Sequence, residues 1–101
     1  MKQLSIEKII ETNNWYQRYC GAQNELAERD IPCNWDACLS ELKDICKELL
    51  IEDKFDWKVL KERLKNEETD VHNDILFIED KIGYLLNDLI YGYIYGGKNG
   101  N

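Results

Sequence analysis

The sequence predicts an all-α fold, a small antiparallel bundle of three to four helices that ends in a long C-terminal helix. Two observations predict it. Apolar residues recur at the three- and four-residue spacing of an α-helix, and residues that favour helix ends lie between these amphipathic stretches. The chain has 101 residues, of which 44% are hydrophobic, so we expect residues 1–101 to form a single helical domain around one core.

The first helix is predicted from about residue 6 to about residue 28. Ser5 is a good N-cap, and apolar side chains follow it on two neighbouring helical stripes. Two pairs of residues weaken this helix, Asn13-Asn14 and Cys20-Gly21. Asn competes for backbone hydrogen bonds and Gly loses more entropy on ordering, so the sequence leaves open a break at either pair.

A turn is predicted around Pro32, because proline disfavours helix at the residue before it, and Asn34 can then cap a second helix. This is the clearest helix in the chain, since its apolar residues all fall on one face. They are Trp35, Cys38, Leu39, Leu42, Ile45, Cys46, Leu49 and Leu50.

A short connection over residues 51–55 precedes a third helix. We expect Asp53 or Asp56 to cap this helix, which carries apolar residues at Trp57, Leu60 and Leu64. The polar stretch 65–70 is either a loop or the exposed turn of one continuous rod formed by the third and fourth helices, and the sequence leaves both alternatives open.

The last helix begins near Val71 and shows an alternating four- and three-residue spacing that resembles a coiled-coil seam. The seam continues through Ile75, Ile78, Ile82, Leu85 and Leu89. A glycine pair at residues 96 and 97 is expected to end the helix, and residues 97–101 are expected to fray.

The net charge of the chain and the distribution of its charged residues limit the classes of partner that it can bind. The net charge is −7, and acidic residues outnumber basic ones in both halves of the chain. The lysines alternate with carboxylates at helical spacing and form no basic cluster in the sequence, which disfavours direct binding to nucleic acid. The acidic surface would suit a protein partner with a basic surface; the alternative is an ordinary solvated surface.

The sequence has neither the apolar stretch of a signal peptide nor a run long enough to cross a membrane. We therefore expect a cytoplasmic protein without membrane contact, whose cysteines are free thiols. The alternative to buried thiols is a zinc site built from Cys20, Cys33, Cys38, Cys46 and His72. The cysteine spacing favours buried thiols, because structural zinc sites use closer pairs.

Two pairs of carboxylates suggest an alternative that involves metal. Glu25/Glu28 and Glu41/Asp44 each lie three residues apart, a pattern that resembles the all-α nucleoside triphosphate pyrophosphohydrolases of the MazG type. The resemblance covers at most residues 15–66 and implies that these four acids hold Mg²⁺, which would activate water for triphosphate hydrolysis. The chain departs from that family's pattern at Ala22, where a glutamate is usual.

The tyrosines near the C-terminus are the main candidates for partner binding. Tyr84, Tyr91 and Tyr95 form one stripe beside the apolar seam, so the helix has more apolar surface than one bundle contact needs. Gly92 and Gly96 would let another backbone approach. The alternative is that the tyrosines cover the bundle core.

These observations favour a small acidic non-catalytic interaction protein, an inhibitor or adaptor that binds another protein or forms a homodimer, with no cofactor. Its predicted binding surface combines the tyrosines with an acidic turn that contains Glu67, Glu68, Asp70 and Asp74. Phage-encoded inhibitors of nucleic-acid-binding defence enzymes, such as anti-CRISPR proteins, share this size and charge. The alternative function is the Mg²⁺-dependent pyrophosphohydrolase.

Overall fold

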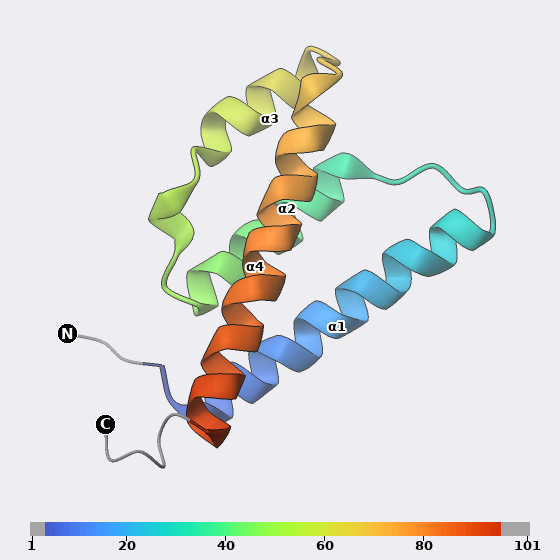
Figure 1. Cartoon of the computed structure of the whole chain (residues 1–101). Coiled ribbons are helices and arrows are strands. Elements are labelled where there is room, and N and C mark those ends of the chain that lie inside the picture. The colour runs from blue at the N-terminus through green and yellow to red at the C-terminus, as the bar shows by residue number, and fades with distance from the viewer. Residues whose placement is uncertain (1–3, 96–101) are drawn as a thin grey trace.

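The computed structural model describes residues 4–95, which form four α-helices and one short 3₁₀ helix (Figure 1). They are α1 (Ile6–Glu28), α2 (Trp35–Glu48), η1 (Glu52–Lys54), α3 (Trp57–Lys65) and α4 (Asp70–Ile94). The described residues contain no strand, and α4 spans 25 residues. The predicted all-α fold with a long last helix is therefore confirmed. The expected fraying of residues 97–101 lies outside the described residues.

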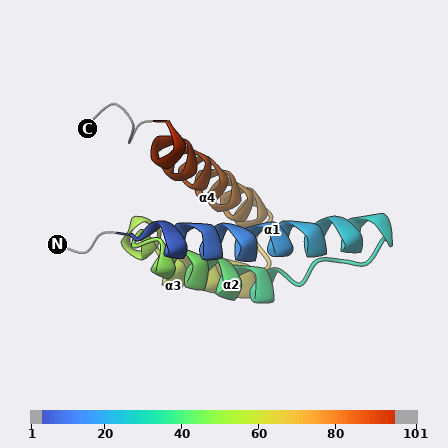
Figure 2. The same cartoon turned by 90° about the horizontal axis from the view of Figure 1, so that it is seen from below.

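The helices form two layers. Consecutive helices run antiparallel (Figure 1), and Figure 2 shows α1, α2 and α3 on one side with α4 crossing them obliquely on the other. Each of these three helices contacts α4. The Cα atoms span 49 × 31 × 17 Å, and the smallest extent is about that of two packed helices. Because α4 forms a layer by itself, its outer side has no helix from the described residues against it.

The predicted N-caps fix where three of the helices begin. Ser5, Asn34 and Asp56 each accept a hydrogen bond at 3.1 Å from the backbone N–H three residues on. These bonds satisfy N–H groups that the first helical turn leaves without a partner. Helix α1 runs unbroken through both of the weak pairs, so the break considered there does not occur.

Two residues in the left-handed region decide how the later helices connect. Glu67 has φ 57° and lies between α3 and α4, so these helices form a hairpin and the continuous rod is excluded. Leu50 has φ 61° and is 51% exposed. Its predicted place on the buried face of the second helix is wrong, because α2 ends at Glu48 and the chain turns there.

The core lies between the layers and draws on all four helices. From α4 it takes a row of side chains that are at most 1% exposed: Val71, Ile75, Ile78, Ile82 and Leu86. The predicted seam placed Leu85 and Leu89 in this row, which is wrong, since both are only partly buried at its edge. The helix has about 3.6 residues per turn, so a strict seven-residue pattern drifts around it and Leu86 comes to face the core.

A buried polar cluster joins α1 to α4. The Tyr16 hydroxyl donates to the backbone carbonyl of Glu79 at 2.6 Å, and the Tyr19 hydroxyl donates to the Glu79 carboxylate. Burial raises the pKa of Tyr19, as does its hydrogen bond to Glu79, so the hydroxyl stays protonated and able to donate. The cluster fixes the rotation of α4 against α1 and thereby decides which side chains α4 turns to solvent.

Among the residues that the structure describes, no helix combines the length and the apolar character that crossing a membrane requires.

Candidate interaction surface

The outer face of α4 carries a stripe of exposed aromatic rings, which we call the outer stripe. Its members are Phe77, Tyr84, Tyr91 and Tyr95, which are 56%, 70%, 66% and 54% exposed. They are spaced seven, seven and four residues apart, so they share one face of the helix. The sequence predicted the three tyrosines as a stripe and missed Phe77, although its position seven residues before Tyr84 carried the same signal.

The outer stripe belongs to a helix whose other side is fixed in the core. Ile78 and Ile82 are buried in the core on the inner side of α4, and Glu79 accepts hydrogen bonds from the two tyrosine hydroxyls of α1. At the C-terminal end the rings of Tyr91 and Tyr95 lie against each other, with centroids 4.6 Å apart and an interplanar angle of 43°. The aromatic rings are thus displayed on a rigid element, which lowers the entropy lost when a partner binds.

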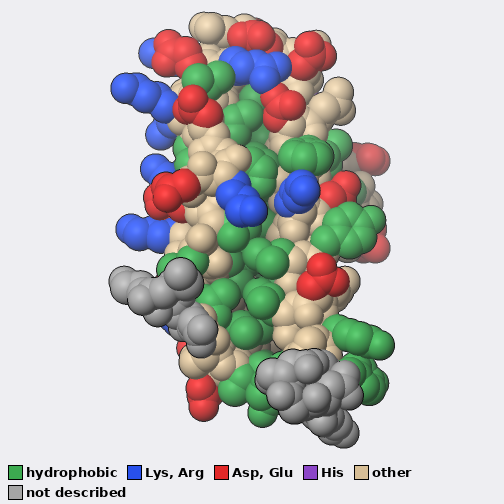
Figure 3. Space-filling view, turned by 60° about the vertical axis from the view of Figure 1, so that its left-hand side comes forward, with side chains coloured by type: hydrophobic (Ala, Val, Ile, Leu, Met, Phe, Trp, Pro, Cys, Tyr) green, Lys and Arg blue, Asp and Glu red, His purple; other side chains and the backbone are tan. Residues whose placement is uncertain are grey.

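A groove runs beside the outer stripe. It has a volume of about 530 Å³ and lies between α4 and the connection that contains η1. Its apolar lining comes from both sides: Ile51, Phe55, Phe77, Tyr84 and Leu85. Lys54, Lys81 and Asp88 supply the charges, and the Lys81 ammonium lies 5.5 Å from the centroid of the Phe77 ring. Figure 3 shows hydrophobic side chains in a band along the middle of the molecule with charged residues at its margins. The surface offers apolar area and a few charges that could orient a partner.

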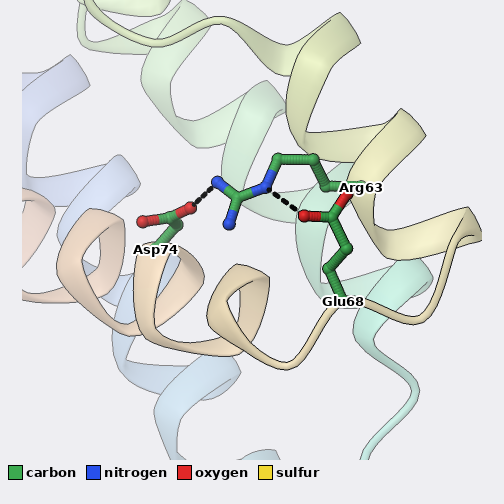
Figure 4. A network of polar contacts seen from close by, with 3 residues as sticks. All are labelled: Arg63, Glu68 and Asp74. Atoms are coloured by element: carbon green, nitrogen blue, oxygen red, sulfur yellow. Dashed lines mark hydrogen bonds and ion pairs between the residues drawn. The ribbon is translucent and has the colours of Figure 1, made fainter.

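The acidic turn divides into two parts. Glu67, Glu68 and Asp70 are exposed, and of the four acids Glu68 and Asp74 accept from the guanidinium of Arg63, Glu68 at 3.4 Å (Figure 4). Arg63 belongs to α3, and the two acids lie just before and within α4, so these contacts close the α3–α4 hairpin. Of the four acids in the predicted binding surface, two therefore help to hold the fold.

The four carboxylates of the metal alternative do not converge. Glu25 lies 4.0 Å from Arg29, and Glu41 accepts from the Trp15 indole at 2.8 Å. Glu28 and Asp44 are exposed. In the described part of the chain, no three His, Cys, Asp or Glu side chains are placed to hold a metal ion. Glu41 faces α1 and joins the two helices through Trp15.

Two of the cysteines form a close pair. The sulfur atoms of Cys33 and Cys38 lie 3.1 Å apart, and the Gln23 amide contacts both. Burial and the neighbouring thiol raise the pKa of Cys33 to about 12, so it stays a thiol at neutral pH. His72 stacks on Trp35 with centroids 4.7 Å apart and so acts as a packing residue.

No family model, curated protein or solved structure matches this chain in the three comparisons with known proteins.

Proposed function

We propose that this protein is a small, acidic, non-catalytic interaction protein, an inhibitor or adaptor that binds another protein through the outer stripe of α4. One observation carries the proposal. Four aromatic rings on a single helix face are each more than half exposed, on a helix whose opposite face is fully buried. Contiguous exposed apolar surface of this kind marks interaction sites in soluble proteins.

The chemistry of the stripe supports protein binding. A tyrosine ring buries a large area at low entropic cost, while its hydroxyl keeps a hydrogen-bond partner in water or across an interface. The three tyrosines are therefore tolerated in solvent and remain suitable for docking. The flanking groove adds apolar area from Ile51 and Phe55.

The charge of the protein supports a partner with a basic surface. Glu67 and Asp70 are exposed at the N-terminal end of α4, where no basic side chain is recorded within 4.0 Å of them among the described residues. A net charge of −7 would speed the encounter with a positively charged groove, such as one that otherwise holds nucleic acid. Charge would then set the rate of association, and the aromatic rings would supply most of the affinity.

Photo-crosslinking tests the proposal. A photoreactive phenylalanine analogue would replace Tyr84, and a control protein would carry it at Ile31, which is 44% exposed in the α1–α2 connection. We expect a protein from the native cell to crosslink at position 84 and not at position 31. The captured protein, once purified, should bind Tyr84→Ala/Tyr91→Ala at least tenfold more weakly than wild type, and Ile31→Ser with unchanged affinity. Equal binding by all three proteins would contradict the proposal.

A further inference from the structure

The outer stripe is part of a longer pattern on α4. Lys81 and Asp88 fall between its aromatic residues, so the spacing from Phe77 to Tyr95 alternates four, three, four, three and four. We call this set the outer seam: Phe77, Lys81, Tyr84, Asp88, Tyr91 and Tyr95. An alternation of three and four is the repeat by which one helix packs along another. Helix α4 therefore has a helix-pairing pattern on its open side as well as on its buried side.

We infer that the outer seam pairs with the outer seam of a second copy of this chain, with the two α4 helices antiparallel. This inference rests on the proposed function, because it names a partner for the same surface. Homodimers with two-fold symmetry are the commonest protein assemblies, and in such an interface one surface patch meets itself.

The antiparallel register brings complementary side chains together. When the two-fold axis passes near the level of Leu86, Phe77 lies opposite Tyr95 of the second copy, and Lys81 lies opposite its Tyr91. Tyr84 lies opposite Asp88 of the second copy. These pairs are two aromatic rings, a cation over an aromatic ring, and a hydroxyl that donates to a carboxylate, and each is a favourable contact. Lys81 and the second copy's Asp88 lie within about one helical turn and can also attract each other.

The parallel alternative is disfavoured by the same residues. It would place Lys81 beside Lys81 and Asp88 beside Asp88, and like charges in contact are unfavourable. The antiparallel arrangement removes both repulsions. The two charged positions of the seam thus select the orientation.

The charge distribution also favours a second copy at this surface. Between residues 76 and 95 the acids are Glu79, Asp80 and Asp88, and Glu79 turns toward Tyr19 in the polar cluster. With Lys81 among them, the outer face of α4 is close to neutral, and most of the acidic charge lies elsewhere on the protein. Repulsion between the acidic side chains that lie elsewhere on the two copies is strongly screened, because the Debye length at physiological ionic strength is about 8 Å.

The available area sets the size class of the interface. An aromatic side chain can bury about 200 Å², so the exposed fractions of the four rings correspond to roughly 1,000 Å² over both copies. That value lies at the lower end of specific interfaces, and the neighbouring groove can add to it. The expected dimer is reversible, with a dissociation constant in the micromolar range.

Sedimentation velocity of the full chain, from low micromolar to submillimolar concentration, tests the inference. We expect a concentration-dependent monomer–dimer equilibrium in the wild type. Lys81→Glu and Asp88→Lys should each weaken the dimer about tenfold, because two-fold symmetry repeats the affected contact. The double variant Lys81→Glu/Asp88→Lys regains the attraction between the two charges, so it should dimerise more tightly than the two single losses combined would give. Ile31→Ser is the matched control and should leave the equilibrium unchanged. Circular dichroism spectra confirm that each variant keeps its helices.

Two results would overturn the inference. One is a wild type that stays monomeric throughout the concentration range. The other is a double variant whose loss of affinity equals the two single losses combined, because a parallel pair or a different surface would not couple the two charges. The proposed function is tested separately: a monomeric wild type that binds its captured partner through Tyr84 and Tyr91 leaves the function intact and removes only the self-pairing. If the wild type stays monomeric and also captures no partner through Tyr84 and Tyr91, both proposals fail.

Discussion

The two faces of α4 carry apolar side chains of different chemistry. The inner face uses aliphatic side chains such as Ile75, Ile78 and Ile82, which are at most 1% exposed. The outer face uses aromatic side chains such as Tyr84 and Tyr91, which are at least 66% exposed. Both follow helical spacing, so periodicity alone does not distinguish a buried face from an exposed one.

The difference in residue type explains the difference in exposure. A branched aliphatic side chain has no polar atom and packs tightly among α1, α2 and α3, so it stabilises the fold. A tyrosine in solvent keeps its hydroxyl hydrated and still offers a large ring to a partner. Folding and binding should therefore be separable on this one helix.

The largest expected effect is on the inner face. Ile82→Ala removes a fully buried side chain and should lower the free energy of unfolding by about 2–5 kcal/mol through lost burial and an internal cavity. Leu76→Ala is the matched control on the same helix, because Leu76 is 47% exposed, and it should change stability by no more than about 0.5 kcal/mol. Urea unfolding followed by circular dichroism measures both. Equal losses would mean that the two faces do not differ in their contribution to folding.

The second prediction makes one substitution on both kinds of tyrosine. Tyr19→Phe removes the hydroxyl that donates to the half-buried Glu79 carboxylate, and should cost about 1–3 kcal/mol of unfolding free energy. Tyr84→Phe removes a hydroxyl that lies in solvent, so the unfolding free energy should stay the same. Chemical denaturation at a concentration where the chain is monomeric checks both variants. A stable Tyr19→Phe would show that the polar cluster is not needed to hold α4.

A third prediction concerns Gly92, which lies on α4 with nothing within 4 Å of where a Cβ would be. Alanine is the better helix former, so Gly92→Ala should raise the unfolding free energy by about 0.5–1 kcal/mol if this side of the helix is open. The same denaturation experiment measures it. A loss of stability would indicate a neighbour at this position and would close part of the outer face.

The smallest expected change is a dependence on pH. Burial raises the pKa of Glu79, and the nearby Asp80 carboxylate adds to this, although the hydrogen bond from Tyr19 acts in the opposite direction. The folded state therefore holds the Glu79 proton up to a higher pH than the unfolded state does. The stability from this group is present below its ordinary pKa and is lost as pH rises through the raised value.

Glu79→Gln removes that titration and leaves an amide oxygen that can still accept from Tyr19. Its unfolding free energy should fall less than that of the wild type between pH 4 and pH 7, as measured by denaturation at each pH. Parallel pH profiles for the two proteins would contradict the assignment of this slope to Glu79.

Much of the fold could be predicted from local signals. The limits of α1 follow from Ser5 and the helical spacing of its apolar residues, although the sequence did not exclude a break at two weak pairs. The start of α2 follows from Asn34 after the only proline. The sequence did not distinguish a hairpin at Glu67 from a continuous helix, because a polar stretch is equally typical of an exposed helical turn and of a loop. A non-glycine residue in the left-handed region, as at Glu67 and Leu50, leaves no mark in the sequence.

The candidate surface was predicted in outline and corrected in detail. Helical spacing placed the three tyrosines on one stripe. The acidic turn was predicted as one surface, but Glu68 and Asp74 bind Arg63 within the α3–α4 hairpin. That pairing depends on the angle between α3 and α4, which arises from long-range packing. The role of Glu41 as acceptor for Trp15 was missed for the same reason, because its partner lies 26 residues away on another helix.

The central claim is that the tyrosines of the outer stripe serve binding and not folding. The most direct test is the unfolding free energy of the triple variant Tyr84→Ala/Tyr91→Ala/Tyr95→Ala, measured in urea at a concentration where the chain is monomeric. We predict that it stays within about 1 kcal/mol of the wild type, since surface side chains contribute little to stability. A loss of several kcal/mol, comparable to that of Ile82→Ala, would show that the tyrosines belong to the core and would contradict the account.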